Sequence, residues 1–520
     1  MDYKAYYEYI PSDGVNLFTV VLLPQDVEKF PSVIVRTPYV DWLEEKTEEY
    51  ITELCKGESE EWLSRGYAMV IQHCRGRGKS NGDCIPYVNE GKDSNNLYNW
   101  VREQNFYNGE LYLMGTSYLT SVHYCASPYK DDIKGAIFGM QDTERYNLCY
   151  RNGVLKKELQ PSWYVDMYKA KSKACERLPS ELFEMLPLTD FTKTVFGEEV
   201  SDFGDMLISP KRTDAFWQTL PGGSDARGAT DKLDFPVLYI TGFYDIYTGG
   251  IFDMWNRMDE NTRRNSALVV SAYDHSDGYG KDSIVFKNGN RKEKFGTNYP
   301  IDWFDSVRKG NTECFKRGKV TYFRIFEDEW YTDDFYISGE SITLPLGKER
   351  ITYEYNPDDP PKFNGGLCCN FGGAQFQPKP NLRGDIISVY TEPFPRDTAV
   401  QGKMTARLTV SSDCEDTCFY MRISIEKQEG DYGLRDDITT LCHQLGDYTP
   451  NTDVALDFTF DEHSFLIKSG ERLRIDVASA DNANYVRHTN NKGLYSIQTS
   501  TKIAKNTVDL LKSIITIPIL

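Results

Sequence analysis

Short apolar runs alternate with stretches of helical spacing over roughly the first 140 residues of the chain. Four of these runs have the length and composition of buried strands: Val15–Leu23, Val33–Arg36, Ala68–Gln72 and Ile133–Met140. Between them, residues 42–65 and Asp93–Glu103 carry apolar side chains at the spacing of one helix face. This alternation predicts an α/β fold with a doubly wound parallel sheet, in which ligands bind beyond the carboxyl ends of the strands.

A further buried strand, Leu111–Met114, runs into the turn Gly115–Tyr118 and then into a short helix, Ser121–Ala126. A serine at the apex of such a junction is held in strained backbone, with its hydroxyl open to substrate and a helix N-terminus beneath it. Ser117 is therefore a candidate nucleophile. The alternative is a serine that only caps the helix, and Leu119 stands where the usual G-x-S-x-G elbow has a small residue.

The alternation of strands and helices breaks near residue 145 and resumes near residue 231. Leu155–Leu186 has helix-like apolar spacing, and Pro161 and Pro179 divide it into separate helices. We therefore expect residues 145–230 to form an inserted helical cap. Insertions over the end of a sheet commonly shape the substrate pocket.

The remaining segments divide into two parts. Residues 1–144 and 231–330 are expected to make one α/β catalytic domain. After residue 330, short alternating strands are separated by turn residues: Ile351–Tyr355, Ile386–Tyr390, Met404–Val410, Cys418–Ile425, Val454–Phe460 and Leu473–Val477. Residues 331–520 are thus predicted to form an all-β sandwich or jelly-roll domain.

Two further residues follow strands of the expected sheet and complete a candidate triad. A serine hydroxyl needs a general base, and the base needs an acid that fixes its tautomer. Asp245 follows the buried strand Pro236–Thr241, and His275 follows Ala267–Ser271, which we expect to be the last strand of the sheet. The order Ser117, Asp245, His275 is that of the α/β-hydrolases, so we expect the three to converge at one edge of the sheet.

The chain has only six histidines, so elimination is informative. Three of them fall in the expected all-β domain: His443, His463 and His488. His123 lies on the helix after Ser117, where packing is the expected role. His73 ends a strand and stays open as another base. Its loop, residues 73–80, is rich in glycine and arginine but lacks the G-x-x-x-x-G-K-S/T order of a phosphate loop.

The net charge and the cysteine pattern indicate which binding partners and which cellular location to expect. The net charge is −19 and no basic block occurs, which argues against nucleic acid and anionic membranes as partners. The N-terminus has no basic region followed by an apolar run, and no stretch is long enough to span a bilayer. The 12 cysteines are scattered without zinc-ligand spacing, as expected of reduced thiols in a cytoplasmic protein that holds no metal.

Several short motifs together resemble the CocE/NonD family of serine hydrolases, the group that contains cocaine esterase and the X-prolyl dipeptidyl peptidases. The resemblance covers nearly the whole chain. Its motifs are R-T-P-Y at Arg36–Tyr39, R-G-R-G-K-S-N-G at Arg75–Gly82, G-T-S-Y at Gly115–Tyr118, G-F-Y-D at Gly242–Asp245, D-H-S at Asp274–Ser276 and D-E-W at Asp328–Trp330.

The resemblance implies an α/β-hydrolase core with an inserted helical cap and a C-terminal jelly roll, acting without a cofactor. It implies Ser117 as nucleophile, His275 as general base and Asp245 as its orienting acid. The Tyr39 hydroxyl and the Tyr118 backbone N–H would form the oxyanion hole. Without the resemblance, Tyr39 would be taken for a core or rim aromatic residue.

Two positions depart from the family pattern. Thr120 stands three residues past the serine, where the family usually has glycine, and this exchange is expected to alter packing under the turn. His73 stands where the family usually has an acidic residue before the Arg-Gly loop, and the exchange removes an expected partner of Arg75 or Arg77.

The resemblance leaves the substrate open among small esters, amides and short peptides. An X-Pro dipeptidyl peptidase needs carboxylates to hold a substrate ammonium, and Asp142 and Glu144 follow the strand beside Ser117. Their alternative is a solvated loop. A second class of function is a non-catalytic binding protein on a hydrolase scaffold, with the β domain as recognition module. The sequence leaves the question of a homo-oligomer open.

Overall fold

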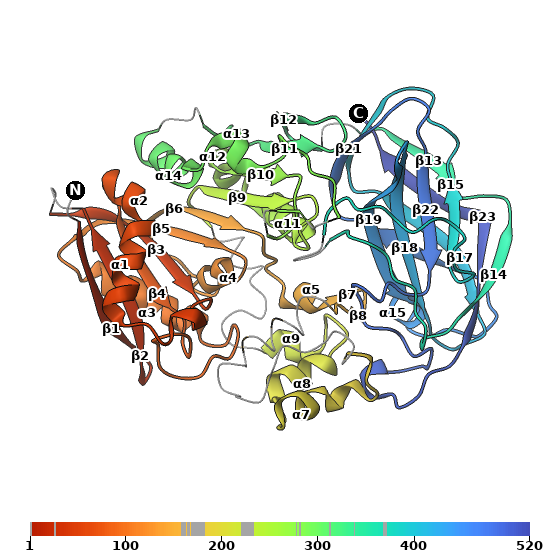
Figure 1. Cartoon of the computed structure of the whole chain (residues 1–520), viewed down its shortest axis with the longest axis horizontal. Helices are drawn as coiled ribbons and strands as arrows, with labels where there is room; N and C mark the ends of the chain where they lie inside the picture. Colours follow the sequence, from red (N-terminus) through yellow and green to blue (C-terminus); the bar gives the residue numbers. More distant parts are fainter. Residues whose placement is uncertain are drawn as a thin grey trace.

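The computed structural model of the chain describes residues 3–24, 28–157, 163, 167, 183–219, 233–276, 278–279, 282–310, 314–336, 339–367 and 372–520. A twisted sheet flanked by helices lies at one end of the molecule and an all-β body at the other (Figure 1). Helix α5 (Arg145–Cys149) and the hairpin β7–β8 lie between them, and helices α7–α9 lie below. The predicted combination of an α/β core with a C-terminal all-β domain is confirmed.

The first body is built on a ten-stranded sheet with the order β1-β2-β4-β3-β5-β6-β9-β10-β11-β12. Strands β4, β3, β5, β6, β9, β10 and β11 are parallel, and β1, β2 and β12 join them by antiparallel pairing. The strands span Lys4–Ser12 (β1), Val15–Leu23 (β2), Phe30–Thr37 (β3), Ala68–His73 (β4), Tyr107–Thr116 (β5), Ile133–Gly139 (β6), Val237–Gly242 (β9), Ala267–Ser271 (β10), Val320–Arg324 (β11) and Glu329–Asp333 (β12).

Helices cover both faces of this sheet because successive strand residues point into opposite cores. Val33 joins the core under one set of helices, and its neighbour Ile34 joins the core under the other. The first set consists of α1 (Glu48–Glu58), α2 (Glu60–Ser64) and α14 (Tyr299–Lys309), and the second of α3 (Glu90–Arg102), α4 (Tyr118–Tyr124) and α11 (Thr248–Arg257). Shorter elements are η1 (Asp41–Leu43), α12 (Glu260–Asn265) and α13 (Arg291–Phe295).

The sheet is wider than the sequence predicts. Strand β10 is not its last strand, because β11 pairs with it in parallel and β12 follows in antiparallel. At the opposite edge, β1 was not expected. Both edge strands, β1 and β12, carry mostly exposed or half-buried side chains, so neither shows the apolar run by which buried strands are found.

The segment expected to be a helical cap begins with the short helix α5, but a β-hairpin of β7 (Tyr150–Arg151) and β8 (Val154–Leu155) follows it. Its turn, Asn152-Gly153, has φ of +46° and +83°, the backbone that a tight two-residue hairpin requires. Leu155 therefore pairs with Tyr150 and does not open a helix. Most of the predicted helical stretch 155–186 lies outside the described residues. The helices described after it are η3 (Leu188–Asp190), α7 (Phe191–Phe196), α8 (Ser201–Leu207) and α9 (Ala215–Thr219).

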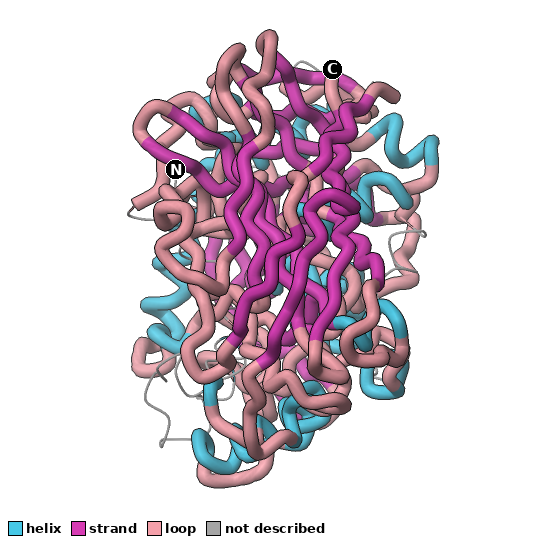
Figure 2. Tube along the Cα trace, turned by 90° about the vertical axis from the view of Figure 1, so that its right-hand side faces the viewer, coloured by secondary structure: helices cyan, strands magenta, loops and turns pink. Residues whose placement is uncertain are grey.

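The second body is a sandwich of antiparallel sheets, whose strands run side by side in Figure 2. One sheet has the order β13-β23-β17-β20, with β14 also on β23, and another has the order β15-β22-β18-β19. The elements span Ser341–Pro345 (β13), Arg350–Tyr355 (β14), Ile387–Tyr390 (β15), Thr398–Gly402 (β16), Thr405–Ser412 (β17), Cys418–Lys427 (β18), Gly430–Thr440 (β19), Leu441–Leu445 (α15), Val454–Thr459 (β20), His463–Ile467 (β21), Leu473–Ala478 (β22), Tyr495–Ile497 (η4) and Ala504–Pro518 (β23).

Backbone hydrogen bonds join the two bodies. The N–H of Ile325, just after β11, donates to the Ser464 carbonyl at 3.0 Å, and the Leu466 N–H donates to the Ile325 carbonyl at 2.9 Å. Arg151 of the hairpin forms ion pairs with Asp437 (2.7 Å) and Asp461 (3.0 Å) of the β body. Within the described part of the chain, no helix is both long and apolar enough to cross a membrane.

Candidate active site

Ser117 lies at the junction of β5 and α4 in a backbone conformation that is rare for a residue other than glycine. Its φ is +56° and its ψ is −133°. The Ser117 N–H donates to the Gly139 carbonyl at the end of β6, at 2.8 Å. Gly115 permits the tight turn, because a Cβ there would lie 2.1 Å from the Leu119 carbonyl oxygen. Such local strain, worth roughly 1–3 kcal/mol, persists only where the surrounding structure enforces it.

The predicted convergence of three side chains is present as a chain of hydrogen bonds. His275 Nε2 lies 2.9 Å from Ser117 Oγ, and His275 Nδ1 lies 3.0 Å from Asp245 Oδ1. Asp245 is fully buried, and its Oδ2 accepts a hydrogen bond from the Thr241 hydroxyl at 2.8 Å. A carboxylate beside Nδ1 favours the tautomer with the proton there, which leaves Nε2 to accept the serine proton.

The Asp245 carboxylate and the imidazole are both held in place by Tyr247. Its backbone N–H donates to Asp245 Oδ1 at 3.1 Å, and its ring packs edge-on against the His275 ring, with 5.2 Å between centroids. The His275 imidazole is therefore oriented by packing as well as by hydrogen bonding.

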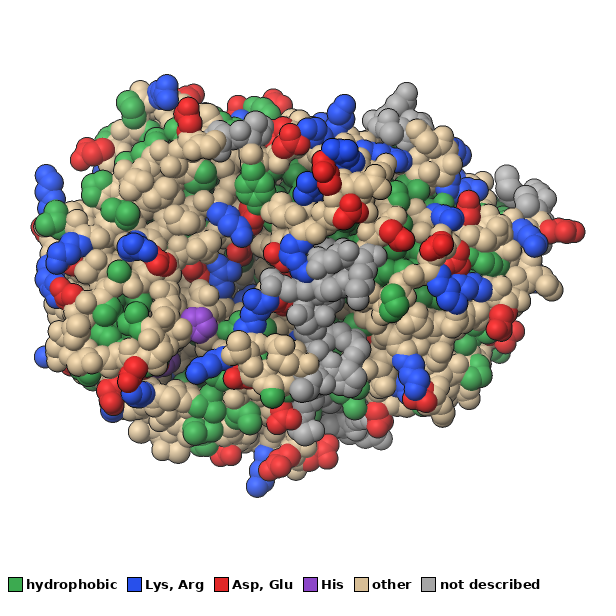
Figure 3. Space-filling view, turned by 180° about the vertical axis from the view of Figure 1, so that it is seen from behind, with side chains coloured by type: hydrophobic (Ala, Val, Ile, Leu, Met, Phe, Trp, Pro, Cys, Tyr) green, Lys and Arg blue, Asp and Glu red, His purple; other side chains and the backbone are tan. Residues whose placement is uncertain are grey.

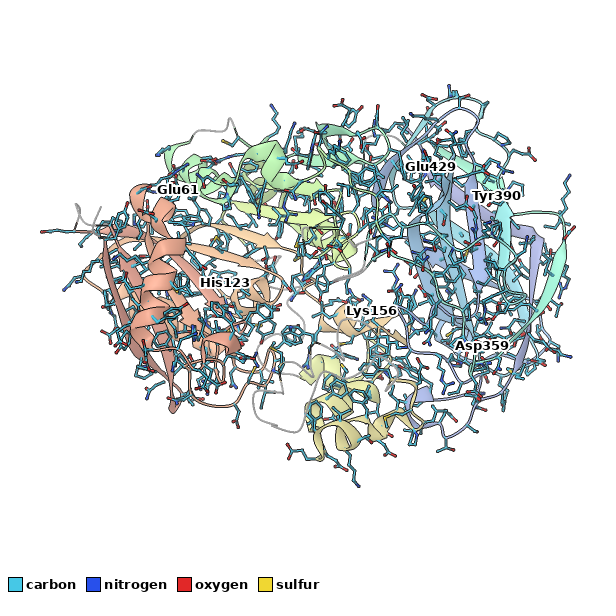
Figure 4. The ribbon with its side chains drawn as sticks, in the orientation of Figure 1. Glu61, His123, Lys156, Asp359, Tyr390 and Glu429 are labelled. Atoms are coloured by element: carbon cyan, nitrogen blue, oxygen red, sulfur yellow. The ribbon has the colours of Figure 1, made fainter. Side chains whose placement is uncertain are left out.

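His73 does not lie at this site. Its Nδ1 accepts the Lys79 N–H at 3.3 Å, its ring packs on Phe18, and burial lowers its pKa to about 4. His123 packs between the Tyr98 hydroxyl, 2.6 Å from Nδ1, and the sheet, where Figure 4 labels it, and burial lowers its pKa to about 3. Packing is therefore the role the structure gives to both.

Trp163, a residue that the sequence did not single out, contacts both Tyr39 and Tyr118. Tyr39 follows β3 and is 42% exposed, and the indole N–H of Trp163 donates to its hydroxyl at 3.2 Å. The Trp163 ring lies 5.1 Å from the Tyr118 ring. Tyr118 is the first residue of α4, where a backbone N–H has no partner within the helix. Trp163 falls in the stretch that the sequence predicts to be helical. Nothing in the apolar spacing of that stretch indicates that Trp163 contacts Tyr39 or Tyr118.

The two departures from the family pattern are compensated. Thr120 Oγ1 donates to the Gly115 carbonyl at 2.8 Å and accepts the Gly139 N–H at 3.1 Å, so its hydroxyl ties α4 to the two strands beside it. Arg75 forms an ion pair with Asp93, with Nη2 2.6 Å from Oδ1. Arg77 pairs with Asp41. Carboxylates from other segments thus replace the acidic residue that His73 displaces.

Asp142 and Glu144 are both engaged within the protein. Asp142 accepts the Glu144 N–H at 2.8 Å and the Asn147 side-chain amide at 3.1 Å, and burial raises its pKa. Glu144 is buried and forms an ion pair with Arg212. The solvated loop, the alternative for these two residues, does not describe Glu144.

The surface between the two bodies is hollowed, with Lys and Arg side chains near the hollow in Figure 3. A cavity in this region is lined by Ile246, which follows Asp245, and by Lys156, which Figure 4 places in the middle of the molecule. Residues Asp436, Asp461 and Tyr485 complete it from the β body. In the part of the chain that is described, no three His, Cys, Asp or Glu side chains are grouped so as to hold a metal ion.

Comparison with known proteins identifies the family. The model of the X-Pro dipeptidyl-peptidase (S15) family matches residues 13–277, about half of the chain. The chain belongs to this family. The model of the X-Pro dipeptidyl-peptidase C-terminal non-catalytic domain matches residues 352–510 of this chain. The predicted relation to CocE/NonD serine hydrolases is confirmed, and the S15 member is a serine hydrolase.

Individual relatives agree with the family. Cocaine esterase of Rhodococcus sp. (strain MB1 Bresler) is 24% identical over 93% of this chain and 91% of its own. An α-amino acid ester hydrolase has the same fold, with a TM-score of 0.82 at 17% identity over 100% of this chain and 97% of the other. A CocE/NonD family hydrolase of Staphylococcus aureus superposes with a TM-score of 0.68 at 14% identity, over 99% and 93% of the two chains.

The buried imidazole of His73 makes stability depend on pH. The unfolded chain binds a proton at this position below pH 6.5, whereas the folded chain does so only near pH 4. Folding stability is therefore present at neutral pH and is lost as the pH falls through this window. Between pH 7 and pH 4.5, the unfolding free energy of wild type should fall about 2–3 kcal/mol further than that of His73→Gln. Urea titrations of both proteins at the two pH values measure these losses. Equal losses in the two proteins would contradict the burial argument.

Proposed function

We propose that Ser117 is the nucleophile of an acyl-transfer reaction in which His275 is the general base and Asp245 its orienting acid. The hydrogen-bonded chain from Ser117 Oγ through His275 to Asp245 is the observation that carries this proposal. Ser117 Oγ attacks the substrate carbonyl carbon while its proton passes to His275 Nε2. The protonated imidazole then donates this proton to the leaving alcohol or amine, and the acyl group remains on Ser117.

Water completes the cycle by the reverse sequence. His275 Nε2 takes a proton from water, the hydroxide oxygen adds to the acyl carbon, and the proton returns to Ser117 Oγ as the acid leaves. Asp245 stays ionised throughout and stabilises the imidazolium that forms twice in each turnover. No cofactor is needed in either half of this reaction.

We assign the oxyanion hole to the Tyr39 hydroxyl and the Tyr118 backbone N–H. Tyr39 lies two residues past β3, which pairs in parallel with the strand β5 that leads to Ser117, and Tyr118 follows Ser117 as the first residue of α4. Trp163 supports the assignment because it contacts both residues. In the contact with Trp163 the Tyr39 oxygen is the acceptor, and the indole N–H is the donor.

The substrate class we favour is a small ester, with X-Pro dipeptides as the second candidate. The relatives include an esterase and an ester hydrolase by name, and the family model is named for a dipeptidyl peptidase. Asp142 and Glu144 would have to hold a peptide ammonium, yet both carboxylates already have partners within the protein. The engagement of these two carboxylates favours the ester.

We also retain the domain division as a proposal: residues 1–144 and 231–330 catalytic, 145–230 a cap over the site, and 331–520 the β domain. Trp163 supports the role of the cap, because this residue of the inserted segment contacts Tyr39. The cytoplasmic location stays a prediction.

The nucleophile is tested by labelling with a fluorophosphonate probe, which phosphonylates an activated serine. We expect wild type to be labelled and Ser117→Ala to take no label. Ser117→Ala or His275→Ala should lower kcat about 10⁴-fold or more, because the members of a triad act as a unit. Absence of label on wild type, or equal label on Ser117→Ala, would favour the non-catalytic binding protein.

The Tyr39 hydroxyl is tested by Tyr39→Phe, which keeps the ring and removes one donor to the oxyanion. The loss of one such donor costs roughly 3 kcal/mol, so kcat should fall on the order of 10²-fold with little change in KM. Steady-state kinetics on a chromogenic ester measure both constants. An unchanged kcat would rule out the oxyanion role of this hydroxyl.

The substrate class is tested with a panel of acyl, aminoacyl and Xaa-Pro chromogenic substrates. We expect kcat/KM for the best ester to exceed that for Xaa-Pro-nitroanilide at least about tenfold, since the Asp142 and Glu144 carboxylates already have partners within the protein. Asp142→Asn should leave ester hydrolysis within a few-fold of wild type. A brisk nitroanilide rate that Asp142→Asn abolishes would favour the X-Pro dipeptidyl peptidase instead.

A further inference from the structure

A buried ion pair lies directly beneath the helix that begins at Ser117. Glu90 on α3 is 5% exposed, and its Oε2 accepts a hydrogen bond from Arg36 Nη1 of β3 at 2.6 Å. Its other oxygen, Oε1, accepts the Tyr118 hydroxyl at 2.8 Å. The Tyr118 oxygen in turn accepts the backbone N–H of Tyr87 at 2.9 Å. The phenol of the residue after Ser117 is thus held at its far end by two partners.

Hydrogen bonds also connect Arg36 of this ion pair to the middle of α4. Arg36 Nη1 also donates to the Ser94 hydroxyl at 2.8 Å, and this hydroxyl donates to the Val122 carbonyl at 2.7 Å. Further along, Gly91 of α3 packs so closely on α4 that a Cβ at this position would lie 2.1 Å from the Cys125 carbonyl oxygen. Helix α4 is therefore tied to α3 at its first turn, its middle and its end.

Charge and geometry give Glu90 a specific task. A carboxylate beneath the site would oppose negative charge on a substrate oxygen, but Arg36 neutralises it at close range. What remains is a short, charge-assisted hydrogen bond that fixes the Tyr118 ring. Burial raises the pKa of the Tyr118 phenol well above its usual range, so the phenol stays a neutral donor. Since the ring and the backbone N–H belong to one residue, fixing one restricts the other.

We propose that Glu90 is a positioning residue for the oxyanion hole: it anchors the Tyr118 phenol and so aims the Tyr118 backbone N–H at the developing oxyanion. This role rests on the proposed function of Ser117. Glu90 does not touch substrate. It acts through Tyr118, at the end of α3 nearest the nucleophile, and the Arg36–Glu90 pair serves transition-state binding as well as the core.

The test removes the anchor and measures binding of a tetrahedral adduct. A trifluoromethyl ketone accepts Ser117 Oγ at its carbonyl carbon, the serine proton passes to His275 Nε2, and the carbonyl oxygen becomes the anion. We expect Tyr118→Phe to lower kcat about 10-fold, to raise the ketone Ki by the same factor and to leave KM within about twofold.

A matched control lies between the same two helices. Tyr98 on α3 is 1% exposed, and its hydroxyl lies 2.6 Å from His123 Nδ1 on α4. Tyr98→Phe deletes an equally buried phenolic hydroxyl and should leave kcat and the ketone Ki unchanged, whatever it does to the melting temperature. Equal effects of Tyr98→Phe and Tyr118→Phe on Ki would show a general loss of packing and overturn the proposal.

Two substitutions of Glu90 separate the effect of side-chain length from that of side-chain charge. They also test the proposal if Tyr118→Phe does not fold. Glu90→Gln keeps the reach: its amide oxygen accepts from Arg36 while its NH2 donates to the second lone pair of the Tyr118 oxygen, so the ring stays held and most of kcat should be retained. Glu90→Asp keeps the charge for Arg36 but is one methylene too short, so it should resemble Tyr118→Phe. The reverse order would overturn the proposal. If wild type takes no fluorophosphonate label, the proposed function itself fails. If wild type is labelled and Tyr118→Phe changes neither constant, only the positioning role fails.

Discussion

The left-handed backbone at Ser117 is the constraint on which the site depends. A serine with φ of +56° points its hydroxyl away from the sheet and toward His275, which an ordinary helical or extended residue there would not do. The cost is met by several independent restraints. The Ser117 N–H binds the Gly139 carbonyl, the Thr120 hydroxyl bridges β5 and β6, and Gly115 leaves room for the Leu119 carbonyl. The strain is therefore distributed over three elements.

Much of this arrangement could be predicted from the sequence because its signals are local. Buried parallel strands appear as short apolar runs, and the side chain that follows each run falls at one edge of the sheet. Ser117, Asp245 and His275 follow such runs, and their predicted convergence is what the structure contains. The C-terminal β domain could be predicted from another local signal, the short alternating strands separated by turn residues.

The parts that the sequence did not reveal depend on partners far along the chain. Glu90 lies on an amphipathic helix, where a carboxylate normally faces water. It is buried here because Arg36 of strand β3 forms an ion pair with it. Trp163 offers its indole to Tyr39, 124 positions away. The hairpin at Asn152-Gly153 did carry a local signal, since this dipeptide favours a tight turn, but the apolar spacing around Leu155 masked it.

The β body also supports the segment that carries Asp245. The Tyr244 hydroxyl donates to the Gly433 carbonyl at 3.2 Å, and the His463 ring stacks on Phe243 with 4.9 Å between centroids. The residues just before Asp245 are thus packed by the other half of the molecule. As a consequence, a substitution on one side of this contact between the halves changes the packing on the other side. Joining the β half of one relative to the core of another would therefore place side chains from different parents against each other in these contacts.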